Sequence, residues 1–181
     1  MKRRLGLVCA PVLIASACRN LPGPFAPPVQ RQPLEDFRPY RMSAIVDMSD
    51  EDARTHFVQD LTSNATPTWR WTGKRPTVRV RMRSAENRSV ENIKFTIDFS
   101  IAGVMLRNTG PLTVSFLVND VVLDRVRYER DGVQHFEKAV PPGLVTAGQD
   151  TTVGAEIDKT WVPPEGGPQL GIILTRIGLT Q

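Results

Sequence analysis

Cysteine and histidine are scarce in this chain. Its 181 residues include two cysteines, Cys9 and Cys18, and two histidines, His56 and His135. Because no cysteine follows Cys18, the rest of the chain has neither a disulfide framework nor a thiolate metal site. The two histidines lie on different expected elements, so their spacing indicates no shared site. We therefore predict no metal site and no bound cofactor.

Catalytic sequence motifs are missing as well. There is no Gly-x-Ser-x-Gly elbow, no His-Glu-x-x-His helix and no glycine-rich phosphate loop. Four acidic residues on expected strands are candidates for the carboxylate pair of a glycoside hydrolase, which is defined by separation in space: Asp98, Asp124, Glu137 and Glu156. A solvated strand face explains them more simply. We predict a protein without catalytic residues.

The chain lacks an excess of basic residues outside its first few positions, although the net charge is +4 and the isoelectric point is about 9.4. Lys2, Arg3 and Arg4 form one basic block, and the other basic residues are nearly balanced by 19 acidic ones. The sequence therefore gives no reason to expect a nucleic-acid partner.

No apolar run is long enough for a membrane-spanning helix, which needs about 20 residues. The longest such run near the start is Leu5–Ala17, which follows the basic block and ends in the small residues Ala15-Ser16-Ala17. This order of basic, apolar and small residues is typical of a secretory signal peptide. We predict a cleaved signal over residues 1–17.

Cys18 follows these small residues directly. The sequence Ala15-Ser16-Ala17-Cys18 resembles the lipobox of bacterial lipoproteins, in which the cysteine becomes the acylated first residue. That family usually has leucine where this chain has Ala15. The resemblance implies lipidation at Cys18 and a lipid-anchored protein in the periplasm or on the cell surface. Arg19 differs from the aspartate of inner-membrane retention, so the outer membrane is preferred. Secretion with a free thiol is the alternative.

The next segment, residues 18–41, is rich in proline. Proline disfavours both helix and strand pairing and favours an extended, semi-rigid chain. We predict a tether here, followed by a single domain over residues 42–181.

One short helix is expected at about residues 49–61. Ser49 and Asp52 form a start like a capping box, and Ala53, Phe57 and Leu61 recur at a spacing of four. From about Trp69 onward the apolar residues alternate with a period of two, as in half-buried strands. The pair Asn119-Asp120 predicts a tight hairpin turn. Together these features predict an all-β, antiparallel β-sandwich of jelly-roll type with about eight strands.

Aromatic residues near predicted loops are candidates for sugar binding, because a pyranose ring stacks its apolar face on an aromatic plane. We single out Trp69, Trp161 and Tyr128 as ligand-binding candidates. Core packing is the competing interpretation, since each such side chain buries a large area.

Several short motifs resemble one family of domains. They are Trp69-Arg70-Trp71-Thr72-Gly73, Phe116-Leu117-Val118-Asn119-Asp120, Thr160-Trp161-Val162-Pro163-Pro164 and the closing run Leu170–Leu179. Together they are similar to galactose-binding-like, carbohydrate-binding-module-like jelly rolls found beside bacterial polysaccharide genes. Gly167-Pro168-Gln169 stands where related domains often carry an acidic residue and an arginine.

The resemblance implies a non-catalytic envelope lipoprotein whose sandwich binds a saccharide or takes part in polysaccharide handling. A structural or adaptor lipoprotein that binds another envelope protein is the second alternative. A glycan-active enzyme is the third.

Overall fold

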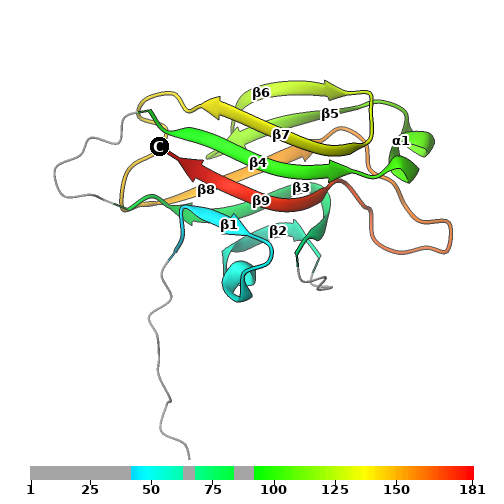
Figure 1. Ribbon diagram of the computed structural model, residues 1–181, viewed down its shortest axis with the longest axis horizontal. Helices are drawn as coiled ribbons and strands as arrows, with labels where there is room; N and C mark the ends of the chain where they lie inside the picture. The colour runs from blue at the N-terminus through cyan, green and yellow to red at the C-terminus, as the bar shows by residue number, and fades with distance from the viewer. Residues whose placement is uncertain (1–41, 63–67, 84–91) are drawn as a thin grey trace, which may run out of the picture. The chain divides into compact units, whose positions relative to one another are not determined.

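The computed structural model describes residues 42–62, 68–83 and 92–181 (Figure 1). The predicted signal peptide, the tether and Cys18 lie outside these residues. Within them the chain forms nine strands, one 3₁₀ helix and one α-helix. In chain order they are β1 (Ile45–Asp47), η1 (Glu51–His56), β2 (Phe57–Leu61), β3 (Arg70–Arg81), β4 (Lys94–Ile101), α1 (Gly103–Thr109), β5 (Leu112–Val118), β6 (Val121–Tyr128), β7 (Gly132–Ala139), β8 (Asp150–Ile157) and β9 (Ile173–Thr180).

The strands form two packed layers. The front layer has the order β1-β9-β4-β7, and the back layer has the order β2-β3-β8-β5-β6 (Figure 1). Neighbouring strands are antiparallel in both layers. The prediction of an antiparallel β-sandwich of jelly-roll type is therefore confirmed.

Strand β3 belongs to both layers. Its first residues, Arg70 and Trp71, pair with β9 in the front layer. Its last residues, Thr77–Arg81, pair with β8 in the back layer. Between them lie Gly73 and Pro76, and proline cannot donate a ladder hydrogen bond. The strand therefore changes layers where its sequence is least suited to continuous pairing.

The core lies between the layers and follows the period-two pattern of the sequence. Its largest fully buried side chains include Phe95 and Phe99 of β4 and Phe116 of β5. Phe116 also stacks on Phe136 of β7, with ring centroids 3.7 Å apart and an interplanar angle of 11°. Because β5 and β7 belong to different layers, this stack joins the two sheets near their outermost strands.

The predicted hairpin turn is present between β5 and β6. Asn119 has a φ of 47° and Asp120 a φ of 63°. Two successive residues with positive φ give the turn whose twist matches the flanking strands. Asparagine and aspartate tolerate this conformation better than other residues with a side chain.

The helix predicted at about 49–61 is shorter than expected. A 3₁₀ helix covers Glu51–His56, and Phe57–Leu61 form strand β2 instead. The four-residue spacing of Ala53, Phe57 and Leu61 was therefore misleading. Phe57 pairs with Val78 of β3, and this distant partner outweighs the local helical pattern.

A second difference lies before β5. Residues Gly103–Thr109 form helix α1, which the period-two pattern of the sequence does not predict. The helix ends at Gly110, whose φ is 71°. Lys159 caps this end, since its Nζ donates to the carbonyl oxygens of Thr109 and Pro111 at 3.2 and 2.6 Å. Lys159 lies 50 residues after Thr109 in the chain, so no local sequence pattern indicates this contact.

Candidate functional site

Two tryptophans lie at the start of the shared strand β3, on the outer surface of the front layer, here called the front face: Trp71 within the strand and Trp69 just before it. Trp69 and Trp71 are half-buried, whereas Arg70 and Thr72 between and after them are buried. Side chains alternate across a strand, so the tryptophans point away from the core that Arg70 and Thr72 face. The two indoles meet edge to face, with centroids 6.4 Å apart and an interplanar angle of 87°.

Strand pairing places three further residues in line with Trp71, so that the four form a row across the front face. Trp71 pairs with Ile173 of β9, Ile173 pairs with Ser100 of β4, and Ser100 pairs with Val133 of β7. Ile173 and Ser100 are half-buried, and Val133 is 84% exposed. We call these four residues the apolar row. It is mostly hydrophobic and it faces outward.

A second row lies beside the first. Asp47 of β1 pairs with Arg176 of β9, Arg176 pairs with Asp98 of β4, and Asp98 pairs with His135 of β7. We call these four residues the polar row. A β-bulge separates the two rows on β9, where Thr175 donates from Oγ1 to the carbonyl oxygen of Asp98 at 2.8 Å. Bulges commonly re-aim side chains in this way.

The polar row is held by charge and by hydrogen bonds. His135 Nδ1 lies 2.5 Å from Asp98 Oδ1, and both side chains are accessible to solvent. Hydrogen bonds from the hydroxyl and the backbone N–H of Ser49 lower the pKa of Asp47, and the charge of Arg176 lowers it further. Arg176 thus stands between two carboxylates. The row therefore places hydrogen-bond donors and acceptors side by side on the surface.

The residues singled out from the sequence lie in different settings. Trp69 is on the front face. Trp161 is half-buried, forms a bridge with Leu170 in the loop between β8 and β9, and packs against the core. Tyr128 also packs against the core, with its ring edge-on to Phe99 at 5.4 Å. Burial and the charge of Asp124 raise the pKa of Tyr128. The structure therefore places the three candidates on three different segments: Trp69 just before β3, Trp161 in the β8–β9 loop and Tyr128 at the end of β6.

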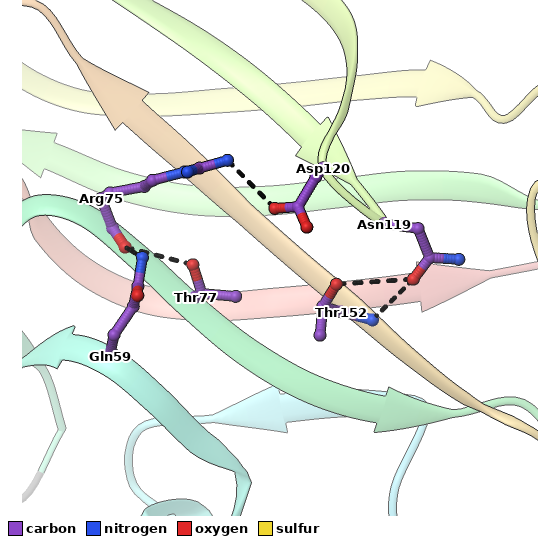
Figure 2. Close-up of polar contacts among 6 residues, drawn as sticks. All are labelled: Gln59, Arg75, Thr77, Asn119, Asp120 and Thr152. Atoms are coloured by element: carbon purple, nitrogen blue, oxygen red, sulfur yellow. Dashed lines mark hydrogen bonds and ion pairs between the residues drawn. The ribbon is translucent and has the colours of Figure 1, made fainter.

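A separate polar cluster occupies the outer surface of the back layer (Figure 2). Arg75 forms an ion pair with Asp120 at 3.0 Å. Asn119 Oδ1 accepts from the N–H of Thr152 at 3.0 Å, and Gln59 Nε2 donates to the carbonyl oxygen of Arg75 at 3.1 Å. These groups mainly bond one another across β2, β3, β8 and the β5–β6 turn. The contacts of Asp120 and Asn119 hold the β5–β6 turn against β3 and β8.

The arginines that alternate along β3 also lie on the back layer. Arg79 and Arg81 of β3, and Arg83 just after the strand, are all exposed. Arg81 forms an ion pair with Asp150 of β8 at 2.6 Å. An outer sheet face with local charge pairing, and not a uniformly basic surface, is what the structure supports here.

The acidic candidates for catalysis are largely engaged with basic side chains. Asp98 bonds His135, Glu137 bonds Lys94 at 2.7 Å, and Asp124 bonds Lys138 at 2.7 Å. Asp98 and Glu137 lie on the front face, whereas Asp124 links β6 to β7. The pairs hold these carboxylates at the surface.

Two further properties concern only the residues that the structure describes. No group of three or more His, Cys, Asp or Glu side chains among them is arranged to hold a metal ion. No helix among them is long and apolar enough to cross a membrane.

Comparisons with known proteins assign no family to the chain. No family model matches the chain, and no curated protein matches it. A solved structure described as a family 35 carbohydrate binding module from an environmental isolate is similar at 14% identity and a TM-score of 0.42. The similarity covers 75% of this chain and 95% of that one. The chain is an antiparallel β-sandwich protein, and its own surface has to indicate what it binds.

Sequence reasoning missed most of the front face. Asp98 was considered only as a candidate catalytic carboxylate and His135 only as an isolated histidine, and Ile173, Arg176 and Val133 received no functional role. Their grouping depends on the pairing of β9 with β3 and β4, which joins positions far apart in the chain. The only local signal was outward-facing alternation along β4 and β7.

Proposed function

We propose that this protein is a non-catalytic saccharide-binding sandwich whose site is the front face. The observation that carries the proposal is the placement of Trp71 and the apolar row directly beside the polar row. The alternatives of a protein adaptor and a glycan-active enzyme lack an equally specific arrangement among the described residues.

Sugar chemistry fits such a surface. A pyranose ring has an apolar C–H face and a rim of hydroxyl groups. The indole of Trp71, with Ile173 beside it, supplies a surface for the C–H face. The Asp98 carboxylate, the His135 ring and the Arg176 guanidinium supply acceptors and donors for hydroxyls. Charged partners make stronger hydrogen bonds than neutral ones, so few are needed to orient a ring.

The test is a titration of the protein with a panel of oligosaccharides and envelope polysaccharides. Binding is measured by tryptophan fluorescence and by calorimetry. We expect a saturable response that Trp71→Ala weakens at least tenfold, because the stacking surface is removed. Val122→Ala, at an exposed position on β6 in the back layer, is the matched control and should bind normally. A flat response from folded protein would reject the proposal and favour the protein-adaptor alternative.

We also propose that the protein is exported and anchored in the cell envelope through a lipid on Cys18, with the outer membrane as its preferred site. The sequence around Cys18 supports this proposal, as does the proline-rich segment after it. Stable anchoring requires more than one acyl chain, which lipoprotein processing provides. Metabolic labelling with a palmitate analogue should mark the wild-type protein and not Cys18→Ala. Labelling of both proteins, or of neither, would contradict lipidation at this residue.

A further inference from the structure

The two rows of the front face run across the strands and stay side by side. Each row takes one residue from each of four strands: β3, β9, β4 and β7 for the apolar row, and β1, β9, β4 and β7 for the polar row. Both rows therefore extend from one side of the layer to the other. In Figure 1 the strands β7, β4 and β9 lie side by side in the front layer.

The length of the rows matters for the size of the ligand. Neighbouring strands are about 4.8 Å apart, so three steps from β3 to β7 span roughly 14 Å. A single sugar ring covers only part of that length. A chain of several rings laid along the rows would keep ring faces over the apolar row and hydroxyls over the polar row throughout.

The charges on this face select among such chains. Its cationic side chains, Lys94 and Arg176, are outnumbered by Asp47, Asp98 and Glu137. Lys94 is paired with Glu137, and Arg176 lies between Asp47 and Asp98. Among the described residues of the face, Lys94 and Arg176 both have carboxylates beside them, with which a carboxylate or sulfate on a sugar would have to compete. An acidic glycan would bring its charge against an already acidic surface.

We infer that the front face binds an internal segment of a neutral polysaccharide, with the chain lying across the strands from β3 to β7. This inference rests on the proposed function and adds the ligand class and its orientation. It assigns Trp71 and His135 to opposite ends of one extended site. Trp71 stacks on a ring at the β3 end, and His135, held by Asp98, bonds hydroxyls at the β7 end.

The test uses the full chain in a polyoxyethylene detergent, because glycoside detergents would compete. Calorimetry compares neutral β-1,4-linked gluco- and manno-oligosaccharides of one to six units with oligogalacturonates of the same lengths. We expect no binding of single sugars, affinity that rises at least tenfold up to about four units and then levels off, and at least tenfold weaker binding of the acidic series.

Two variants locate the ends of the chain. His135→Ala should weaken the longest neutral ligand several-fold and leave the shortest bound ligand unchanged, because only a long ligand reaches β7. Trp71→Ala should weaken every length. Val122→Ala again serves as the control, and circular dichroism checks that each variant is folded.

The outcomes separate this inference from the proposed function. If a single sugar binds as tightly as a hexamer, or if oligogalacturonate binds best, the extended neutral site is wrong while saccharide binding stands. If His135→Ala weakens all lengths equally, the orientation is wrong. If no oligosaccharide of either series binds to folded protein, both proposals are rejected.

Discussion

At the scale of single residues, the close approach of two strands requires glycine at position 154. Gly154 of β8 is buried, and a Cβ atom built there would lie 2.4 Å from the carbonyl oxygen of Pro76 and 3.2 Å from Cα of Thr77. Both neighbours are backbone atoms, which cannot turn away as a side chain can. The absence of a side chain at Gly154 therefore lets β3 and β8 pair where β3 changes layers.

Gly154→Ala should accordingly destabilise the domain by about 1–3 kcal/mol, the usual cost of overpacking. Gly103→Ala is the matched control, because the atoms nearest to its new Cβ would be the side-chain ends of Asp131 and Arg107. Chemical denaturation of the two variants measures the difference. Equal stability of both would show that β3 and β8 relax more easily than their pairing indicates.

Asp124 gives a prediction for pH. Its pKa lies below the ordinary value, chiefly because Lys138 donates a hydrogen bond to it and secondarily because the N–H of Arg125 does so. A lowered pKa in the folded state stabilises the fold above the unfolded pKa of about 3.9, and that stabilisation is lost as the pH falls through the folded value.

Asp124→Asn should therefore lower stability at pH 7 and leave it nearly unchanged at pH 2. Denaturant midpoints at the two pH values measure this effect. Glu165→Gln, in the exposed loop between β8 and β9, is the control and should track the wild type at both. A loss of stability in Asp124→Asn that is equally large at pH 2 would contradict an ionic origin.

At the scale of elements, the turn of the β5–β6 hairpin is stabilised in two ways, by backbone conformation and by side-chain hydrogen bonds. Asn119 adopts a positive φ, and its side chain also bonds the carbonyl oxygen of Leu144 and the N–H of Thr152. Conformation and side-chain contacts therefore make separate contributions at one residue.

Two substitutions separate these contributions. Asn119→Gly keeps the backbone conformation and loses the hydrogen bonds, whereas Asn119→Ala loses the bonds and also strains the backbone. We expect Asn119→Ala to be less stable than Asn119→Gly by about 1 kcal/mol, the order of the left-handed penalty. Thermal unfolding of both variants gives the value. An alanine variant as stable as the glycine variant would mean that the turn rearranges.

Elements also show what the sequence could and could not predict. Strands β3, β4 and β5 were recognisable because their alternation is local, and the Asn119-Asp120 turn because its chemistry is local. Strand β2 was assigned to a helix because its partner Val78 lies elsewhere in the chain. The same reason hid the front face: Trp71 was visible in the sequence, but its neighbour Ile173 became known only through the register of β9. The order of apolar and polar residues predicts whether a segment is a strand. The register in which distant strands pair depends on the whole fold and cannot be predicted from one segment.

At the scale of the whole molecule, the two layers are joined inside and along one edge. The Phe116–Phe136 stack connects β5 to β7, and the ion pair of Asp124 with Lys138 connects β6 to β7. Strand β3 adds hydrogen bonds to both sheets. Neither layer has a core of its own.

The described domain should therefore unfold as a single cooperative unit. Tryptophan emission reports mainly on the start of β3 and on the β8–β9 loop, whereas far-ultraviolet circular dichroism reports on all strands. We expect the two probes to give coincident denaturant transitions. The midpoint should not change with a reducing agent, since no cysteine follows Cys18. Transitions that separate would show that one layer can melt while the other persists.

The passage of β3 from one layer to the other also has a mechanical consequence. A load that pulls the sheets past each other acts along a polypeptide segment anchored by hydrogen bonds at both ends. The covalent backbone between Trp71 and Thr77 then carries tension that side-chain contacts alone would have to resist. A force applied across the front face would thus load a continuous strand and not only the interface between the two sheets.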